Sequence, residues 1–396
     1  MDLLSGTNTG ALFVSSTQQQ QQLEVMASNT LKSGMDSYQK KDYSGAARAF
    51  KGALSMAPNS SFSKDAAKYL AMAELNLGET DKAIEAYKTS IRLNPDLAEP
   101  HVDLAKLYFS EGRYKEAETE YAAAVRIDPS AANHYSLGQT YLFQNRYIEA
   151  EAKFHEVRRL EPKSPYSFYG LGLAYSRQGR YERAIDLFEE ATELDRDFHD
   201  AYAEIGFAYA DLGSMDDAEK VFDFLEEEAP DLADTLSRYM YKVDPPKLVF
   251  ANALSTFSYM TPRMSKVSDL DAYLENANAS KSFTMIFQFD KEMDRISVEN
   301  QFNWRISRAT GAGPGEAYNF GSTVASTEIS ITSFPDNIYW DEDTMTAKVQ
   351  FTIQQNDSAD GTIDPSHIEF KFTGVDKYGL SMDPDKDQYT GFSKVF

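Results

Sequence analysis

A series of side chains that recurs after 34 residues constrains this chain more than any other feature of its sequence. Residues 137–154 carry, in order, a Leu-Gly pair, a tyrosine, an Arg-Tyr pair, an alanine and a phenylalanine, and residues 171–188 carry the same series at the same spacing. Internal repetition with a period of about 20 to 50 residues is typical of proteins in which each repeat packs on the next. Such a stack usually presents an extended binding surface, so the pattern predicts a scaffold.

Weaker copies of the series extend it to six repeats, which span residues 27–60, 64–97, 98–130, 131–164, 165–198 and 199–231. Small residues such as Gly138 and Ala150 are expected where two helices cross closely, and aromatic residues such as Phe154 fill the space between hairpins. Glycines such as Gly112 suit the left-handed cap that ends a helix, and prolines such as Pro162 cannot continue one. Each repeat is therefore predicted to be a pair of helices.

The segment after the repeats, residues 231–243, places Leu232, Leu236 and Met240 at helical spacing. It predicts a closing helix that covers the exposed face of the last repeat, as the end of a solenoid requires. The Pro245-Pro246 pair is expected to end this helix, because proline lacks the backbone N–H that a helix needs.

The repeat region resembles the tetratricopeptide repeat family over about half of the chain. The resemblance implies a right-handed solenoid of about six helical hairpins with a capping helix, over residues 27–245, whose first helices line a concave groove. By repeat position the groove residues are Lys106, Phe109, Tyr135, Gln139, Phe143, Tyr166, Tyr169, Arg177 and Phe207. Aromatic residues are common at binding hot spots, so a protein or peptide partner is expected; the alternative is that the chain's own tail or neighbouring side chains fill the groove.

Some relatives in this family hold a partner's terminal carboxylate with a lysine and an asparagine one helical turn apart. The corresponding positions hold Tyr135 and Gln139 in the fourth repeat and Tyr169 and Leu173 in the fifth, and no repeat has the Lys–Asn pair. The sequence therefore favours an apolar or aromatic peptide over a partner's terminal carboxylate.

From residue 246 onwards the sequence consists of short runs in which apolar residues alternate, as Phe283, Met285 and Phe287 do. Strands are predicted at residues 247–252, 282–289, 303–308, 326–332, 337–340, 347–354, 367–372 and 391–396. Seven or eight strands in about 150 residues are typical of a β-sandwich. Residues 289–294 and 372–379 also resemble parts of bacterial S-layer-type immunoglobulin-like domains, which implies that residues 246–396 form an immunoglobulin-like β-sandwich, a spacer or adhesive module of an exported bacterial protein.

The amino-terminal residues 1–26 are polar and end in five consecutive glutamines at 18–22. Such composition predicts a disordered tail, and the alternative is an export or docking segment anchored by residues 12–14. No classical secretory signal is recognised, so the cytoplasm is the default expectation, with non-classical export or attachment to the cell envelope left open. The chain contains no cysteine, which excludes disulfides and thiol chemistry.

The net charge of −23 is unevenly spread, because residues 182–234 hold 19 acidic and 3 basic side chains. Nucleic acid and anionic membranes are poor partners for such an acidic protein, since both bind clustered lysine and arginine. The acidic segment is predicted to form a solvated convex face, and the alternative is a docking surface for a basic partner.

No catalytic motif, cofactor motif or metal site stands out. His101 and His134 occupy equivalent repeat positions and are predicted to be packing residues rather than metal ligands. Asp383, Asp385 and Asp387 alternate as in a calcium loop but lack its glycine and glutamate, so a solvated turn is preferred over a calcium site. The sequence thus predicts a non-enzymatic adaptor that binds a peptide or protein segment; the alternative is an exported or envelope-associated structural protein.

Overall fold

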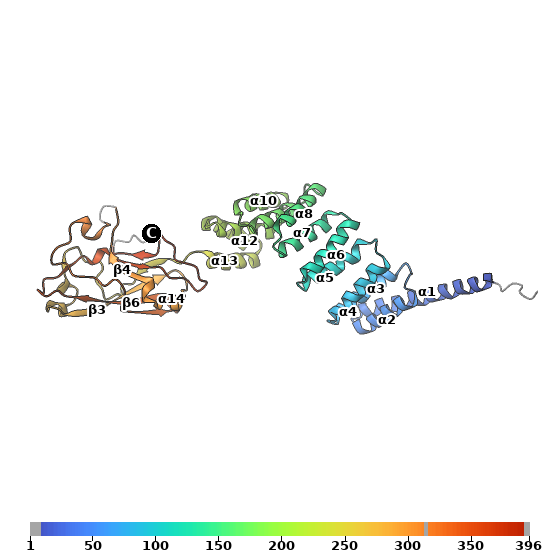
Figure 1. Cartoon of the computed structure of the whole chain (residues 1–396), viewed down its shortest axis with the longest axis horizontal. Coiled ribbons are helices and arrows are strands. Elements are labelled where there is room, and N and C mark those ends of the chain that lie inside the picture. Colours follow the sequence, from blue (N-terminus) through green and yellow to red (C-terminus); the bar gives the residue numbers. More distant parts are fainter. Residues whose placement is uncertain (1–8, 313–315, 392–396) are drawn as a thin grey trace, which may run out of the picture. The chain divides into compact units, whose positions relative to one another are not determined.

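The computed structural model describes residues 9–312 and 316–391, with the backbone alone for residues 9–17. It divides into a repeat unit, Met1–Ser237, and a strand-rich unit, Arg238–Phe396 (Figure 1). This division lies within the closing helix; the domain boundary at residue 245 stays a prediction.

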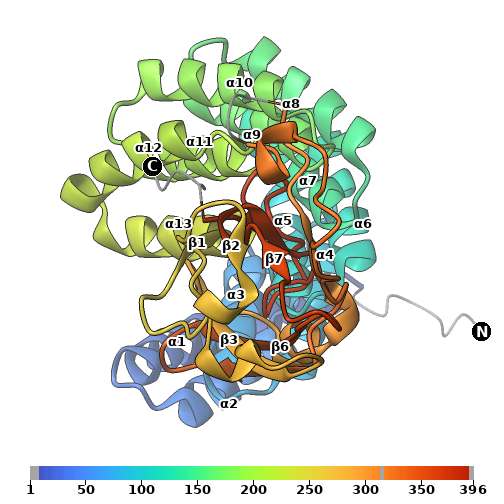
Figure 2. The same cartoon turned by 90° about the vertical axis from the view of Figure 1, so that its left-hand side faces the viewer.

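The repeat unit is a series of helical hairpins that follow one another along the chain (Figure 2). Their helices pair as α1 (Thr9–Gln39) with α2 (Tyr43–Met56), α3 (Ser63–Asn76) with α4 (Thr80–Leu93), α5 (Ala98–Ser110) with α6 (Tyr114–Ile127), α7 (Ala131–Phe143) with α8 (Tyr147–Leu160), α9 (Pro165–Ser176) with α10 (Tyr181–Leu194), and α11 (His199–Asp211) with α12 (Met215–Glu228). Helix α13 (Pro230–Val243) follows the last hairpin. The predicted helical solenoid is therefore confirmed.

Glycines of the first helix and phenylalanines of the second allow the two helices of a hairpin to pack closely, as predicted. A Cβ atom on Gly172 would lie 2.5 Å from the ring of Phe188, and one on Gly138 would lie 2.7 Å from the ring of Phe154. Both phenylalanines are fully buried. Each of these glycines therefore allows the ring of the second helix to pack directly on the backbone of the first.

Left-handed residues join the two helices of a hairpin. Gly112, Gly179 and Gly213 have φ between 71° and 75°, and Asn145 takes the same place in the fourth repeat with φ 59°. Asparagine tolerates this conformation better than other residues with a Cβ, so the fourth hairpin keeps the same turn without a glycine.

Helix α1 begins at Thr9, whereas the sequence predicted a disordered tail up to residue 26. Gln, Leu, Glu, Met and Ala are good helix formers, and adding residues to an existing helix costs less than starting a new one. The side chains of residues 18–26 are exposed. Residues 1–8 and the side chains of the proposed anchor at 12–14 lie outside the described part of the chain.

The strand-rich unit has two main antiparallel sheets. The four-stranded sheet has the order β1 (Leu248–Ala251), β3 (Ser280–Phe289), β6 (Thr346–Gln354) and β5 (Asn337–Asp341), the three-stranded sheet has the order β4 (Trp304–Arg308), β8 (Ile368–Phe372) and β9 (Gln388–Tyr389), and β2 (Ser265–Lys266) pairs with β7 (Thr362–Ile363). Short helices are α14 (Arg295–Glu299), η1 (Val267–Asp269), η2 (Ala272–Glu275), η3 (Gln301–Asn303), η4 (Tyr318–Gly321) and η5 (Pro365–His367).

One aromatic core joins the two main sheets. Phe287 of β3 contacts Trp304 of β4 and Phe370 of β8, with ring centroids 5.5 and 5.2 Å apart. In the register Phe283 faces Phe351 on the neighbouring strand, so the alternating apolar residues of β3 and β6 lie on the same face. The strand-rich character is confirmed, while the immunoglobulin-like assignment stays a prediction.

Some of the predicted strands differ from the structure. Residues 326–332 form only isolated bridges, Glu328 to Thr362 and Ile331 to Ile353, because the segment runs beside two other strands without a continuous ladder on either. All but the first residue of the predicted strand 391–396 lie outside the described residues. Helix α14 was not predicted. It begins at Arg295, and the preceding Asp294 caps it, because its carboxylate accepts a hydrogen bond from the amide of Ser297.

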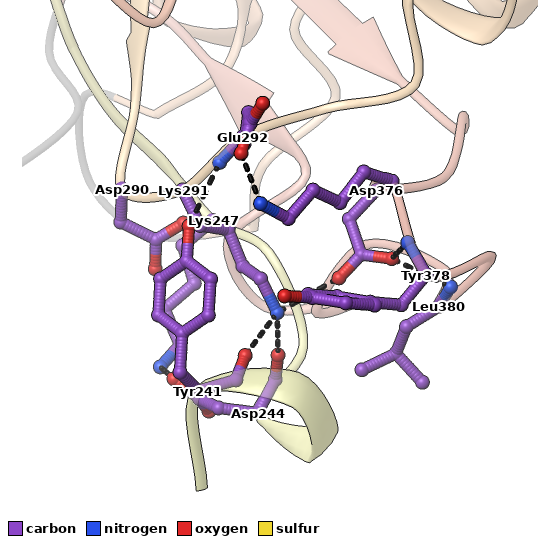
Figure 3. A network of polar contacts seen from close by, with 10 residues as sticks. Tyr241, Asp244, Lys247, Asp290, Lys291, Glu292, Asp376, Tyr378 and Leu380 are labelled. Atoms are coloured by element: carbon purple, nitrogen blue, oxygen red, sulfur yellow. Dashed lines mark hydrogen bonds and ion pairs between the residues drawn. The ribbon is translucent and has the colours of Figure 1, made fainter. Parts of the chain in front are cut away.

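A buried lysine connects the last turn of α13 to the strands (Figure 3). The ammonium of Lys291 donates hydrogen bonds of 2.7 Å to the carbonyls of Tyr241 and Asp244 and forms an ion pair of 2.8 Å with Asp376. The carboxylate of Asp376 also accepts from the amides of Tyr378 and Leu380. The end of α13 therefore belongs to the strand-rich unit, because its last carbonyls are capped from there.

The candidate binding groove

The predicted groove residues fall into two aromatic groups on the first helices of the central hairpins. The larger group, called here the central patch, consists of Tyr135 on α7, Tyr166 and Tyr169 on α9, and Phe198 at the start of α11. Ring centroids are 5.9 Å apart for Tyr135 and Tyr166, 5.3 Å for Tyr166 and Phe198, and 4.8 Å for Tyr169 and Phe198. The four rings therefore form one cluster across three hairpins, in which Tyr166 is exposed and the other three are partly buried.

The central patch is supported from beneath by the rings that close the hairpins. Tyr135 lies 5.5 Å from Phe154, and Tyr169 lies 5.7 Å from Phe188. Tyr166 is 53% exposed. Burial raises the pKa of Tyr135 to about 12 and raises the pKa of Tyr169 as well, so both hydroxyls are protonated at neutral pH and can donate hydrogen bonds.

Two carboxylates of α11 face the central patch. Asp200 and Glu204 both contribute to the raised pKa of Tyr169, and Asp200 contributes to that of Tyr135. Glu204 is partly buried, and burial raises the pKa of its carboxyl; Arg177 opposes this shift, and Asp200 and Asp211 add to it. Within the described part of the chain, no hydrogen bond or ion pair reaches the carboxylate of Glu204.

The smaller aromatic group lies where the first helices end. Phe109 of α5 contacts Tyr114 and Phe143 with ring centroids 5.3 and 4.9 Å apart, and Tyr114 stacks on Phe143 at 5.3 Å. Phe143 is 57% exposed. The structure thus brings Phe109 and Phe143 together, but in a group separate from the central patch.

The remaining predicted residues have different surroundings. Lys106 is exposed on α5, and Arg177 is exposed at the end of α9. Gln139 is partly buried and lowers the pKa of Tyr135, against the larger effect of burial. Phe207 is partly buried on α11. None of these four adds an exposed aromatic surface to the central patch.

Sequence reasoning missed Phe198, Asp200 and Glu204 as groove residues. Asp200 follows Tyr166 by one repeat of 34 residues, so its repeat position could have placed it in the groove. The repeat positions of Phe198 and Glu204 do not identify them as groove residues, because their surroundings depend on how the neighbouring helices pack.

The first helices near the amino terminus differ from those of the central patch, because their charges are paired. Lys68 of α3 lies 2.5 Å from Glu99 and 3.8 Å from Asp103, both on α5. The hydrogen bond from Lys68 lowers the pKa of Glu99. Glu99 and Asp103 therefore have a lysine within 4 Å, whereas in the described part of the chain Glu204 forms no ion pair at that distance, although Arg177 lowers its pKa.

Most acidic side chains of residues 182–234 lie on α10 and α12 and are exposed. Two of them form ion pairs with neighbours three residues away, Asp186 with Arg183 at 3.5 Å and Asp217 with Lys220 at 2.7 Å. Exposed pairs of this kind contribute little to stability. Whether this face also binds a basic partner stays a prediction.

The most triad-like polar cluster in the described residues is closed to solvent. His367 Nδ1 lies 2.7 Å from Asp364, and the hydroxyl of Ser366 donates to Asp364 at 2.8 Å. All three residues are at most 2% exposed, so the cluster has no access for a substrate. The arrangement is that of a buried network that stabilises a loop.

The described residues contain no group of three or more histidine, cysteine or acidic side chains placed to hold a metal ion. His101 is bound to Glu120 at 2.6 Å, and His134 is buried with its pKa lowered by that burial. Asp387 pairs with Lys371 at 3.0 Å. No helix in the described part of the chain has the length and apolar character needed to span a membrane.

Comparison with known proteins gives one family match. A model of the Tetratricopeptide repeat family matches residues 31–98, 70–132, 135–197 and 169–233, which together span just over half of the chain. Small glutamine-rich tetratricopeptide repeat-containing protein 2 of Mycosarcoma maydis is 35% identical over 92 residues, which are 23% of this chain and 25% of that protein. The chain therefore spans about a quarter of the length of that relative.

Two solved structures are similar to the repeat unit. A tetratricopeptide repeat protein from Parabacteroides merdae ATCC 43184 has a TM-score of 0.48 and 17% identity, over 55% of this chain and 88% of that one. YrrB, described as a tetratricopeptide repeat protein with an unusual peptide-binding site, has a TM-score of 0.38 and 21% identity, over 49% of this chain and 100% of that one.

Proposed function

Because the chain belongs to the tetratricopeptide repeat family, we propose that it is a non-enzymatic adaptor that holds a peptide or protein segment of a partner in the groove lined by α5, α7, α9 and α11. Proteins of this family generally mediate protein–protein interactions. The observation that carries the proposal is the central patch, in which aromatic rings of three successive hairpins form one surface.

The exposure of this patch supports a binding role. Tyr166 is more than half exposed, although its ring contacts both Tyr135 and Phe198. Tyrosines supply a large apolar area together with a hydroxyl that can hydrogen-bond, which suits a surface that is covered only when a partner binds. Tyr135, Tyr169 and Phe198 are partly buried around it, so Tyr166 is the ring that a partner would cover most.

The proposal predicts that removing one exposed ring weakens partner binding. Full-length protein with Tyr166→Ala should recover several-fold less partner from an extract of the native cells than the wild type, because a hot-spot ring contributes about 2 kcal/mol or more. Ile148→Ala, at a residue of α8 that is 78% exposed outside the patch, is the matched control and should recover the wild-type amount. Equal recovery with Tyr166→Ala and Ile148→Ala would reject the groove as the binding surface.

A second candidate function is that of an exported or envelope-associated structural protein, with an immunoglobulin-like strand-rich unit as spacer or adhesive module. One observation favours it: the two segments that resemble S-layer-type domains meet in the fold. Met293 bridges Asp376, and the amide of Asp294 donates to the carbonyl of Val375 at 3.2 Å. Fractionation of the native cells tests this candidate, and a purely cytosolic pool would eliminate it.

A further inference from the structure

We propose that Phe198 is a positioning residue of the groove, whose ring holds the exposed ring of Tyr166 in the orientation that a partner segment meets. The inference rests on the proposed function. It names a residue on which the affinity of the groove depends through Tyr166, without direct contact between that residue and the partner.

The residue that precedes α11 differs from those that precede α7 and α9. Ser130 stands before α7 and Ser164 before α9, and the next copy of this position, 34 residues later, is Phe198. Serine is among the residues preferred at the start of a helix, whereas large apolar residues are not. Phe198 therefore does not help to start α11, and its role lies in its contacts with other helices.

The ring of Phe198 packs against two tyrosines of α9. Its centroid lies 5.3 Å from that of Tyr166 and 4.8 Å from that of Tyr169, with the ring planes tilted by 58° and 45°. Tyr166 also meets Tyr135 edge-on, at 5.9 Å and 69°. Aromatic rings at such distances attract each other beyond the effect of the area that they bury. Tyr166 thus has one ring neighbour on α7 and another at the start of α11.

Tyr166 gains from this support because it is the exposed ring of the central patch. It is 53% exposed, whereas Phe198 and Tyr135 are partly buried and pack against the hydrophobic core of the hairpins. An exposed side chain without neighbours moves between rotamers, and fixing it when a partner binds costs entropy. Two anchored rings that hold Tyr166 beforehand reduce this cost.

The first experiment observes the ring of Tyr166 in full-length protein that carries 3-fluorotyrosine at residue 166. In Phe198→Ser the fluorine resonance should become narrower and move towards that of the free amino acid, because the ring gains mobility when its neighbour is removed. Leu97→Ser makes the same kind of change at the residue before α5, outside the central patch, and should leave the resonance as in the wild type. An unchanged line width in Phe198→Ser would overturn the proposal.

The second experiment measures binding. The probes are peptides that full-length wild-type protein selects from a phage-displayed library of random dodecapeptides and that Tyr166→Ala binds more weakly. Fluorescence anisotropy gives their dissociation constants. Phe198→Ser should raise the dissociation constant about fivefold, which corresponds to the cost of ordering one side chain on binding. Phe198→Tyr, which keeps an aromatic ring, and Leu97→Ser should both bind as the wild type does; a loss in Phe198→Tyr equal to that in Phe198→Ser would contradict a role of the ring.

A double-mutant cycle determines whether Phe198 acts through Tyr166. In the Tyr166→Ala background no ring is left to position, so Phe198→Ser should change the dissociation constant by less than about twofold. An equal loss in both backgrounds would indicate direct contact with the peptide or a loss of folding, and either would contradict the proposal.

The outcomes separate this proposal from the proposed function. If Tyr166→Ala weakens the selected peptides and Phe198→Ser does not, the groove function stands and the positioning role fails. A library that yields no peptide whose binding depends on Tyr166 rejects the groove function, and the positioning role with it.

Discussion

Gly172 and Phe188 show what one repeat position requires of a side chain. The ring of Phe188 occupies the space that a Cβ at residue 172 would need, with its nearest carbon 2.5 Å from that position. Gly52 of α2 is different, because a Cβ there would meet only Thr30, at an ordinary distance of 3.8 Å. The same substitution should therefore have opposite effects at the two glycines.

Gly172→Ala should lower the free energy of unfolding by about 1–3 kcal/mol, because the added methyl group overpacks a filled core. Gly52→Ala should raise the free energy of unfolding by about 0.5–1 kcal/mol, since alanine favours the helix and less chain entropy is lost on folding. Urea denaturation of the two variants and the wild type measures both changes. A neutral result for Gly172→Ala would mean that Phe188 can move aside without cost.

The ionised form of Glu204 is less favourable in the folded protein than in the unfolded chain. Its pKa in the folded state is raised, chiefly by burial, with Asp200 and Asp211 adding to the shift and Arg177 opposing it. A raised carboxyl pKa means that the folded state holds its proton more tightly than the unfolded state, whose pKa is about 4.3. The contribution of Glu204 to stability is therefore greatest in acid and falls as the pH rises above the unfolded pKa through the folded one.

This reasoning predicts how the stability of Glu204→Gln depends on pH. Near pH 4 and below, the variant and the wild type should have nearly equal free energies of unfolding, because the glutamate is largely protonated in both states. The variant should become the more stable of the two as the pH rises towards neutrality. Urea denaturation at a series of pH values gives the difference, and a wild type that is more stable than the variant at neutral pH would contradict an unpaired carboxylate.

At the scale of elements, the end of α13 depends on one buried ammonium. Lys291 is 2% exposed and Asp376 is fully buried. The same ammonium donates hydrogen bonds to the carbonyls of Tyr241 and Asp244. The rings of Tyr241 and Tyr378 lie 5.0 and 5.8 Å from the ammonium (Figure 3). A buried charge pair of this kind is most costly when one partner is removed.

Lys291→Met should lower the free energy of unfolding of the strand-rich unit by about 3–5 kcal/mol, because Asp376 is left charged in a dry site. Lys377→Met is the matched control: Lys377 pairs with Glu292 at the surface of the same network, and exposed pairs contribute at most about 1 kcal/mol. Denaturation followed by the fluorescence of the two tryptophans, both in the strand-rich unit, measures these changes. Equal losses in the two variants would refute the role assigned to the buried pair.

At the scale of the whole molecule, the repeats could be predicted from the sequence because one set of positions determines both the period and the packing. The pairing of Gly172 with Phe188 follows from their places in the repeat. Their repeat positions also place Tyr135, Tyr166 and Tyr169 on the first helices, while their role as groove residues stays a prediction. Long alternating segments such as residues 282–289 were equally clear, because alternation over several residues identifies a strand with one buried face.

Other features depend on contacts that a local pattern does not contain. The two-residue strands β2, β7 and β9 are too short to show a period, and Ile329 and Ile331 alternate although their segment forms only bridges. Glu204 was missed because the charged groups that shift the pKa of its carboxyl lie on α11 and at the end of α9, and a local pattern does not show that they are near it. Nothing in the sequence around Lys291 indicates that it is buried, because its partners, Asp376 and the end of α13, are distant in the sequence.

The central claim is that a partner segment lies on the central patch. The most direct measurement places a photo-crosslinking benzoylphenylalanine at residue 166 or at residue 148 of the full-length protein in its native cells, followed by mass spectrometry of the crosslinked products. The account predicts a crosslinked partner peptide from position 166 and none from position 148. Partner peptides crosslinked from position 148 but absent from position 166 would contradict it.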